Sequence, residues 1–368
     1  MLTPIPCLFM RGGTSRGPFF LESDLPADPA LRDRVLLAAM GSPDVRQIDG
    51  LGGADPLTSK VAIVSRSERP GVDLEFLFAQ VLINEPRVDT TPNCGNMLAA
   101  VAPFAIERGL ITPGDSETTA RILTRNTGTL CDVIVQTPGG RIAYEGDERI
   151  DGCPGTSAPI RISFLETAGS VCKSLLPTGH IVDEFEGVRV TCIDNGMPVA
   201  IVAASDLGRT GYESRDELNQ DRELKQRLEA IRLAAGPAMN LGDVSRKVVP
   251  KMTLVAPARA GGSLCTRTFI PHDCHSAVGV LGAVTVATAA VLDGSVARAV
   301  SVVPQGLVKL ISVEHPTGEF SVELEVDAAD PGTVTRAALL RTARLIMRGD
   351  VMIPRAVWNG SPTARLAA

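Results

Sequence analysis

Two segments of the chain are apolar on nearly every side and end at a helix stop signal. Residues 96–108, NMLAAVAPFAIER, run into Gly109, and glycine favours the left-handed conformation that closes a helix. Residues 276–292, SAVGVLGAVTVATAAVL, run into Asp293-Gly294. A helix without a polar face is typical of a protein core. The pattern therefore predicts two buried helices, the first of them kinked at Pro103.

The second of these segments also invites interpretation as a membrane span. It is slightly shorter than the ~20 residues that a span requires, and Gly, Thr and Ser dilute its apolar character. A core helix is the better interpretation, and no membrane association is expected.

Short Val/Ile-rich stretches bounded by Gly, Pro and Asn surround each helix and predict strands. The two predicted helices begin 180 positions apart, at residues 96 and 276, and the turn glycines Gly128 and Gly318 lie 190 apart. The same parts in the same order indicate an internal duplication, although identity between the halves is low. The predicted strands are PCLFM, VAIVS, FLFAQVLI, ARILT and CDVIVQT in the first half, and VRVTCI, PVAIVAA, KMTLVA, SLCTRTFI and VKLISV in the second.

These elements predict an α+β fold of two similar domains, in each of which a curved mixed sheet wraps around a central buried helix. A chain of 368 residues is long enough for two such cores. The domains are expected at residues 1–180 and 181–368, with a linker near SLLPTGHIVDEFEG. The last strand or helix is expected to cross back to the first domain.

Charge and composition exclude several classes of function. A net charge of −6 provides no general attraction to nucleic acid or to acidic membranes, so an anionic ligand must be bound by a local cluster of donors. The N-terminal residues lack the order of charge and apolar run that a secretory signal has, which predicts a cytoplasmic protein. Eight cysteines without CxxC spacing predict reduced thiols.

One cluster of metal-binding residue types occurs, where His272 and His275 flank Cys274. A structural zinc site needs a second pair of ligands, and the sequence offers none at a suitable spacing. We therefore expect no metal and no other cofactor. The donors for an anion are expected at the helix starts, because unpaired N–H groups and a partial positive charge gather there. Paired domains whose helix starts face one cleft would hold a di- or tricarboxylate.

The segment RGGTSRG follows the first predicted strand and contains Gly12, Gly13, Thr14 and Ser15. Its glycines and hydroxyls suit a backbone nest that binds a carboxylate. An ordinary glycine-rich turn is the alternative. The segment has neither the P-loop pattern nor the GxGxxG pattern, so nucleotide binding is poorly supported.

Ser59 and Lys60 stand at the mouth of an apolar strand, after a long glycine-rich loop. Most lysines that begin a strand are solvated surface residues. The apolar neighbours and the two glycine-rich segments instead suggest a backbone close to a ligand, where a lysine would be desolvated. Lys60 is thus our candidate base.

Each predicted helix start carries a cysteine. In the first half, Asn93, Cys94, Gly95 and Asn96 place a thiol where the helix dipole favours the thiolate, with a buried structural cysteine as the alternative. The second start, from Arg267 to Ser276, supplies a guanidinium and another thiol; its alternative is a helix capped by Asp273 or Ser276. The candidate substrate-binding residues of this second start are Arg267, Cys274, His275 and Ser276.

The duplicated order and the cysteine-bearing helix starts resemble the diaminopimelate epimerase fold. Within that fold, RGGTSRG, QIDGLGGADPLTSKVAIV, NCGNMLA, GCPGTSAPI and LLPTG resemble the PrpF-like aconitate and methylaconitate isomerases, over nearly the whole chain. The resemblance implies a cofactor-independent isomerase of a small unsaturated polycarboxylate. It implies no nucleic-acid partner, and it leaves the assembly open between a monomer and a homodimer.

The resemblance also implies roles for single residues. Lys60 falls on the family's proton-abstracting lysine, and Cys94 on its first-helix cysteine, beside a substrate carboxylate held by Asn93, Gly95 and Asn96. The residues of the glycine-rich turn, Gly12 to Ser15, would bind another carboxylate, and Arg267 falls on a carboxylate-binding arginine. In the epimerases, Gly-Thr-Gly follows the second cysteine, whereas in this chain His275 and Ser276 follow Cys274.

Together these expectations describe a 1,3-allylic or keto–enol proton transfer on an unsaturated tricarboxylate. A neutral lysine would take a proton from one carbon, and the resulting ammonium would return it at the far end of the allylic system. Isomerisation of 2-methylaconitate or aconitate, a two-thiol racemase and a non-catalytic carboxylate-binding protein are the alternatives.

Overall fold

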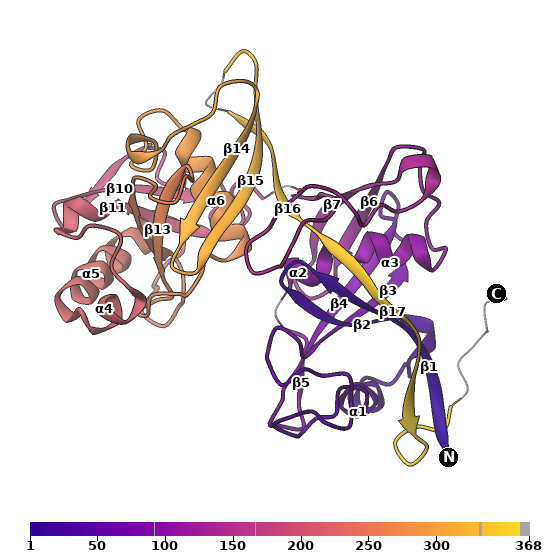
Figure 1. The fold of residues 1–368 in the computed structure, drawn as a ribbon. Coiled ribbons are helices and arrows are strands. Elements are labelled where there is room, and N and C mark those ends of the chain that lie inside the picture. The colour runs from indigo at the N-terminus through magenta and orange to yellow at the C-terminus, as the bar shows by residue number, and fades with distance from the viewer. Residues whose placement is uncertain (92, 166, 331–332, 361–368) are drawn as a thin grey trace. The chain divides into compact units, whose positions relative to one another are not determined.

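The fold was analysed in a computed structural model that describes residues 1–91, 93–165, 167–330 and 333–360. The chain divides into two compact units (Figure 1). The first unit contains Met1–Leu165 and Arg341–Ala368, and the second contains Glu166–Leu340. The chain therefore leaves the first unit at residue 165, whereas the sequence analysis placed the division between residues 180 and 181.

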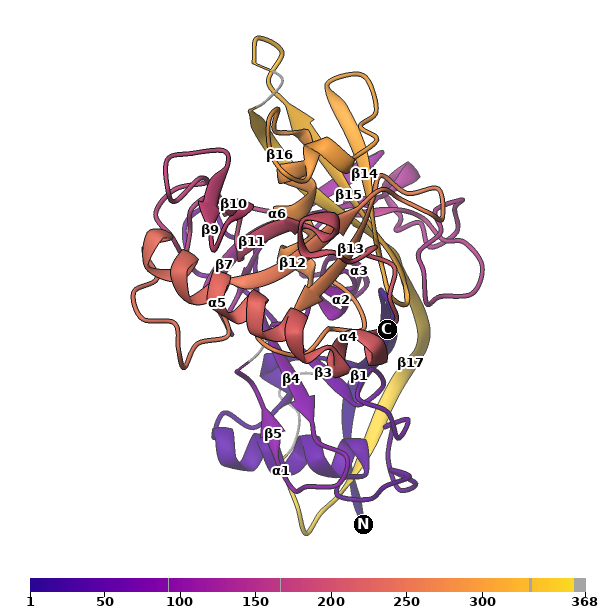
Figure 2. The same cartoon turned by 90° about the vertical axis from the view of Figure 1, so that its left-hand side faces the viewer.

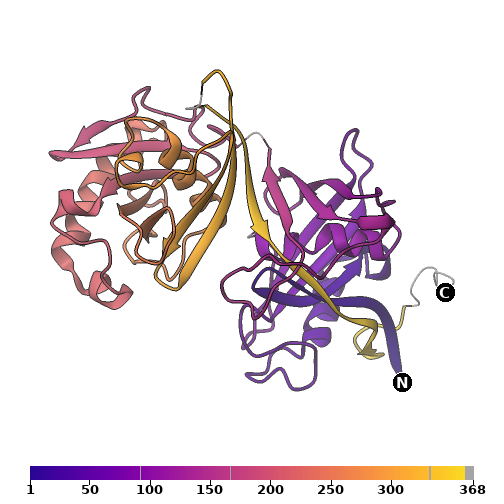
Figure 3. The same ribbon diagram turned by 45° about the horizontal axis from the view of Figure 1, so that its top comes forward.

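The first unit is built on a mixed sheet. Strand β1 pairs antiparallel with both β17 and β2, and Figures 1 and 3 show the yellow β17 beside the indigo β1. Strand β2 also pairs parallel with β3, and β3 pairs antiparallel with β4. Strand β4 pairs parallel with β6, and β7 pairs antiparallel with both β6 and β8. The strands are β1 Leu2–Gly12, β2 Ser15–Leu21, β3 Lys60–Arg66, β4 Leu74–Val81, β5 Val88–Asp89, β6 Glu117–Thr124, β7 Thr129–Gln136, β8 Ile160–Phe164 and β17 Ala343–Pro354; the α-helices are α1 Pro29–Met40, α2 Gly95–Leu98 and α3 Val101–Glu107.

The second unit repeats this order. Strands β9, β10 and β11 are antiparallel, β11 and β12 parallel, β12 and β13 antiparallel, β13 and β14 parallel, and β14, β15 and β16 antiparallel. The strands are β9 Asp183–Phe185, β10 Val188–Asp194, β11 Pro198–Ala203, β12 Lys251–Ala256, β13 Leu264–Phe269, β14 Val308–His315, β15 Gly318–Val326 and β16 Val334–Arg341; the α-helices are α4 Arg215–Gln220, α5 Arg222–Ala238 and α6 Val280–Val291.

The positions of the helices in the chain are explained by the two parallel strand pairs of each unit. Parallel neighbours need a crossover connection, which is usually a helix. Helix α1 connects β2 to β3, and α4 with α5 connects β11 to β12. Helices α2 and α3 lie between β4 and β6, and α6 lies between β13 and β14. The predicted α+β fold of two similar domains is confirmed by this shared order.

The first central helix is interrupted where one helix over residues 96–108 was predicted. It consists of α2 and α3, with a break at Ala99 and Ala100. Pro103 has no N–H to donate to the carbonyl of Ala99, and its ring crowds that carbonyl, so the proline breaks the helix one turn ahead of itself. The interruption is therefore greater than the expected kink.

The second central helix begins later than predicted, at Val280 rather than at Ser276. The preceding residues are held extended, because Cys274 bridges to Phe269 and the His275 N–H donates to the Thr268 carbonyl at 2.8 Å. From Gly282 to Val291 the helix is buried throughout, as its composition predicts. Among the described residues, no helix is long and apolar enough to cross a membrane.

The amphipathic helices α4 and α5, which Figure 2 shows in the second unit, were not among the predicted elements. Their sequence signals are clear in retrospect. Ser214 and Glu217 form a capping box at the start of α4, and Asp221 caps α5 by accepting from the Leu224 N–H. The buried face of α5, spaced as a helix requires, is Leu224, Leu228, Ile231 and Ala235.

A fully buried arginine ties α5 to the segment that follows it. Arg232 makes two hydrogen bonds to the Glu229 carboxylate, at 2.7 and 2.8 Å. Its Nη1 donates to the carbonyls of Val244, Lys247 and Val249 at 2.9, 3.0 and 3.3 Å. These bonds to Arg232 also lower the pKa of Glu229, against the opposing effect of its burial.

We expect Arg232→Met to lower the free energy of unfolding by about 3 kcal/mol, because it leaves a carboxylate and three carbonyls without their donor. Urea unfolding measures the change. Arg227→Met on the exposed face of the same helix is the control, with an expected change within about 0.5 kcal/mol. Equal stability of the two variants would show that the buried arginine does not stabilise the unit.

Candidate active site

The glycine-rich turn and the start of α2 meet in the first unit. Gly12 and Ser15 pair at the end of the β1–β2 hairpin, and Gly13 has a φ of 50°. A Cβ on Gly12 would stand 2.3 Å from the Asn96 carbonyl oxygen, and one on Gly13 would stand 2.2 Å from Asn96 Oδ1. Asn96 Nδ2 donates to Thr14 Oγ1 at 2.9 Å. Only glycine therefore allows the hairpin to approach the helix start this closely.

The hairpin also carries an unused donor. Ser15 is 1% exposed, and its hydroxyl has no hydrogen-bond partner among the described residues. A buried hydroxyl of this kind can bind an anionic oxygen of a ligand. The observation supports the part of the turn that the sequence analysis assigned to carboxylate binding.

Lys60 is the first residue of β3 and is 9% exposed. Its Nζ donates to Gln80 Oε1 at 2.7 Å and lies 4.8 Å from the centroid of the Phe78 ring. A Cβ on Gly17 would stand 1.7 Å from the Lys60 carbonyl oxygen, so β2 passes directly against the lysine backbone. The hydrogen-bond partner of this Nζ is thus a neutral amide and not a carboxylate.

Gln80 is held so that its oxygen faces the lysine. It stands opposite Lys60 in the β3–β4 register, and its Nε2 donates to the carbonyls of Pro56 and Ser59 at 3.1 and 2.9 Å. The sequence analysis missed Gln80 and Phe78. Nothing in the sequence marks them, since their proximity to Lys60 depends on the strand register.

Ser59 is a candidate site residue whose side chain makes structural hydrogen bonds. Its hydroxyl donates to the Val81 carbonyl at 2.7 Å and accepts from Gln47 Nε2, also at 2.7 Å. The side chain is fully buried. Ser59 thus fixes the beginning of β3, and with it the position of the neighbouring Lys60.

Cys94 is the N-cap residue of α2 and is partly buried. Its N–H is bound by Asn93 Oδ1 at 2.8 Å, while its carbonyl accepts from the Leu98 N–H at 3.0 Å. Helix α2 packs against β1, β2 and β3, so Cys94, the hairpin and the strand of Lys60 belong to one cluster of elements. Asn93 contributes its side-chain oxygen to this helix start, and Gly95 is the first residue of α2.

Arg11 is a further residue that the sequence analysis did not select as a site residue. Its Nη1 donates to the Gly13 carbonyl and to Thr342 Oγ1, both at 2.9 Å, and its Nη2 donates to Ser157 Oγ at 3.2 Å. Cys153 Sγ lies 3.1 Å from the same Gly13 carbonyl. Arg11 therefore braces the turn, the 153–157 loop and the returning C-terminal segment.

In the second unit, Arg267 lies in β13 and is 8% exposed. Its Nε donates to the Glu213 carbonyl at 2.8 Å, and its Nη1 donates to the Thr266 carbonyl at 2.8 Å and lies 3.3 Å from Cys265 Sγ. Three of its hydrogen bonds thus fix it within its own unit. Burial raises the pKa of Cys265, and the nearby Arg267 opposes this effect.

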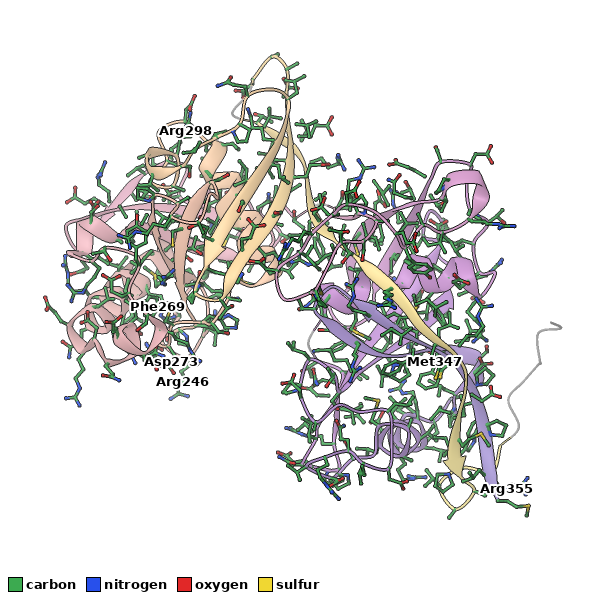
Figure 4. The ribbon with its side chains drawn as sticks, viewed as in Figure 1. Arg246, Phe269, Asp273, Arg298, Met347 and Arg355 are labelled. Atoms are coloured by element: carbon green, nitrogen blue, oxygen red, sulfur yellow. The ribbon has the colours of Figure 1, made fainter. Side chains whose placement is uncertain are left out.

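Cys274 belongs to the hydrophobic core of the second unit. The turn between Phe269 and Asp273, both labelled in Figure 4, places it opposite Phe269, and it is 1% exposed. Burial raises the pKa of its thiol to about 11, with Arg267 and Arg215 opposing the shift. The thiol is therefore protonated at neutral pH.

The alternative considered for the second helix start, a cap formed by Asp273 or Ser276, does not occur in the structure. The N-cap of α6 is Gly279, three residues beyond Ser276. His275 Nδ1 accepts from the Ala277 N–H at 3.0 Å, and the Ser276 carbonyl accepts from a threonine hydroxyl of the following hairpin. Within the described parts of the chain, no three His, Cys, Asp or Glu side chains form a group able to hold a metal ion.

The N-cap residues of the two central helices correspond in the duplicated fold. Cys94 occupies this position at α2, and Gly279 occupies it at α6. A two-thiol racemase needs a cysteine on each side of the carbon that it deprotonates. The second central helix of this chain offers a glycine, and Cys274 is buried elsewhere.

Comparison with known proteins identifies the family of this chain. A family model described as PrpF protein matches residues 2–354. The chain belongs to the PrpF family. One PrpF-like relative, the (4E)-oxalomesaconate Delta-isomerase of Novosphingobium sp. (strain KA1), is 59% identical over 348 residues, which are 95% of this chain and 97% of the relative. The 4-oxalomesaconate tautomerase of Pseudomonas putida (strain KT2440) is 54% identical over 358 residues, 97% of this chain and 98% of its own.

A solved structure from the same group of isomerases matches the whole fold. Methylitaconate-delta-isomerase superposes with a TM-score of 0.86 at 35% identity, covering 99% of each chain. The predicted membership among PrpF-like isomerases, and with it the diaminopimelate epimerase-like fold, is confirmed.

We expect Gln80→Glu to slow turnover near pH 7 and to move the rising limb of the pH–rate profile upward by about one to two pH units. A carboxylate in place of the amide favours the ammonium form of Lys60, which cannot accept a proton. The measurement is kcat from pH 6 to 10. Gln226→Glu on the exposed face of α5 is the control. A profile that matches that of the unaltered protein would show that Gln80 does not tune the base.

We expect Cys274→Ala to retain kcat within about threefold, because the thiol is buried in the core of the second unit and does not cap α6. A modest loss of stability, about 1 kcal/mol, should accompany the smaller side chain. Turnover and thermal unfolding are measured on the same preparation, with Cys94→Ala in parallel. Complete loss of activity in folded Cys274→Ala would restore the two-thiol mechanism.

Proposed function

We propose that this protein is a cofactor-independent isomerase that interconverts 4-oxalomesaconate and its tautomer or double-bond isomer by a 1,3 proton transfer. The observation that carries the proposal is the setting of Lys60. Lys60 is nearly buried, its Nζ has a neutral amide as partner, and the adjoining hairpin supplies an unused donor, the Ser15 hydroxyl. The identities of 59% and 54% to the two oxalomesaconate enzymes support this substrate.

The chemistry needs a base and a site for developing negative charge. Neutral Lys60 takes a proton from the substrate carbon that lies between the carbonyl and the carboxylated double bond. The electron pair spreads into a dienolate, whose charge is stabilised by donors such as the Ser15 hydroxyl and the N–H groups at the start of α2. The lysine then returns the proton at the far end of the allylic system, so the reaction consumes no oxidant or reductant.

Other residues have supporting roles in this proposal. Gly12 to Ser15 and the backbone of Asn93, Gly95 and Asn96 bind carboxylates, and Cys94 orients the substrate or donates a proton. Arg267 holds the β13 region of the second unit. The reaction belongs to the degradation of aromatic acids such as gallate and protocatechuate, in the cytoplasm, with the thiols reduced.

We expect Lys60→Met to reduce kcat by at least about a thousandfold while the circular dichroism spectrum and thermal unfolding stay unchanged, since removal of the base removes acid–base catalysis. Lys309→Met on β14 is the control and should turn over normally. Turnover is followed by ultraviolet absorbance and proton NMR, with 4-oxalomesaconate, 2-methylaconitate and trans-aconitate tested in parallel.

The same NMR experiment in D₂O distinguishes catalysis from binding. An isomerase exchanges the abstracted C–H for deuterium, and Lys60→Met should abolish that exchange. A near-normal rate in Lys60→Met would remove Lys60 from the mechanism. Binding of the tricarboxylates without any exchange would identify a carboxylate-binding protein, and preference for 2-methylaconitate or trans-aconitate would replace the proposed substrate.

A further inference from the structure

Strand β17 forms an edge of the sheet in the first unit. Its 12 residues pair with β1 along one side, from Gly12–Ala343 to Leu2–Pro354. In the described parts of the chain, no backbone–backbone hydrogen bond joins residues 344–353 to any segment other than β1. The other side of the strand therefore presents a row of free N–H and C=O groups, which can pair with a strand of another chain.

The exposed part of this edge strand is rich in apolar side chains. Ile346 is 48% exposed, Met347, which Figure 4 labels, is 41% exposed, and Met352 is 49% exposed. Every residue from Ile346 to Asp350 is exposed, and a Cβ on Gly349 would meet no atom within 4 Å. The strand contains no lysine, and its only proline is its last residue. It thus lacks the residues that commonly keep an edge strand from pairing.

Symmetry limits how two copies of one strand can pair. In an antiparallel pair, residues that stand opposite each other are either both hydrogen-bonded across the pair or both not, and the two kinds alternate along each strand. A residue and the one opposite it in an identical strand are therefore separated by an even number of positions. The two-fold axis must then pass through one residue of the strand.

Strand β17 is complementary to itself when that residue is Gly349. Arg348 of each copy then stands opposite Asp350 of the other copy, which forms two opposite-charge pairs. Gly349 has no side chain to hold the copies apart at the axis. The next pairs on either side are apolar, namely Met347–Val351, Ile346–Met352 and Leu345–Ile353.

The neighbouring registers lack this complementarity. An axis at Arg348 places Ile346 opposite Asp350. An axis at Asp350 places Arg348 opposite Met352, and an axis at Met347 places Ile346 opposite Arg348. Each of these registers sets a charge against an apolar side chain, so the pattern of the strand favours Gly349.

Both charged residues are accessible for this pairing. Asp350 is exposed, and its carboxylate has no hydrogen-bond or ion-pair partner among the residues that the structure describes. Arg348 forms an ion pair with Glu107, yet its side chain is 63% exposed. A guanidinium has five N–H donors and can bind a second carboxylate.

We propose that two copies of this chain form a symmetric dimer by antiparallel pairing of their β17 strands about Gly349. Main-chain hydrogen bonds join the two sheets, and the Arg348–Asp350 pairs fix the register. The partner is a second copy because the strand matches its own sequence. The dimer does not depend on which substrate the protein isomerises.

Two charge reversals test this register. Arg348→Asp and Asp350→Arg each set like charges opposite each other at both pairs, so each variant alone should dissociate with a Kd at least about thirtyfold higher. An equimolar mixture restores both opposite-charge pairs in a mixed dimer, and it should associate as tightly as the unaltered protein. Sedimentation velocity over a dilution series, without substrate, measures the three samples.

Arg344→Asp is the matched control on the same strand. The Gly349 register places residue 344 opposite Pro354, so this variant should dimerise like the unaltered protein. Thermal unfolding checks that each variant remains folded. The proposal is overturned if the unaltered chain is monomeric at micromolar concentration, if neither reversal weakens the dimer, or if mixing the two reversals fails to restore it.

Crosslinking tests the position of the axis by distance. The two copies of residue 349 would lie about 5 Å apart between their Cα atoms, whereas the two copies of residue 347 would be displaced by about 14 Å along the strands. A short bifunctional thiol reagent should link Gly349→Cys into dimers and leave Met347→Cys unlinked. The unaltered chain, with its eight cysteines, gives the background. Linking of Met347→Cys, or no linking of Gly349→Cys above background, would contradict the proposed pairing.

Discussion

The close approach of the β1–β2 hairpin to the start of α2 and to β3 is the constraint on which the candidate site depends. Gly12 and Gly13 lie against Asn96, and Gly17 lies against the carbonyl of Lys60, at separations that leave no room for a Cβ. The hairpin therefore joins the helix start to the strand of the lysine. Arg11 secures the same turn through its hydrogen bonds to Gly13 and Thr342.

The duplicated fold provides the same frame twice, and the two copies have diverged in their chemistry. The first unit keeps a thiol at the N-cap of its central helix and a glutamine beside its lysine. The second unit has a glycine, Gly279, at the N-cap of its central helix. A duplicated fold with a thiol at only one of its two central-helix N-caps is suited to proton transfer by a single base. The N-cap of α6 is a glycine, which carries no thiol.

Much of the fold was predictable because its signals are local. The apolar runs, the glycine stops and the Val/Ile-rich strands indicated two central helices within sheets, and their order indicated the duplication. Helices α4 and α5 were missed although the capping residues Ser214 and Asp221 mark them. The position of Cys274 was misjudged because its pairing with Phe269 draws it into the core of the sheet, away from the helix start.

The sequence by itself determined the fold class, the family resemblance and the choice of Lys60, since these depend on residue types and their spacing along the chain. Only the tertiary structure decided which groups surround that lysine. Gln80 reaches it through the strand register, and Gly17 reaches it through the packing of β2. Register and crossover bring together residues far apart in sequence, and no local pattern records those contacts.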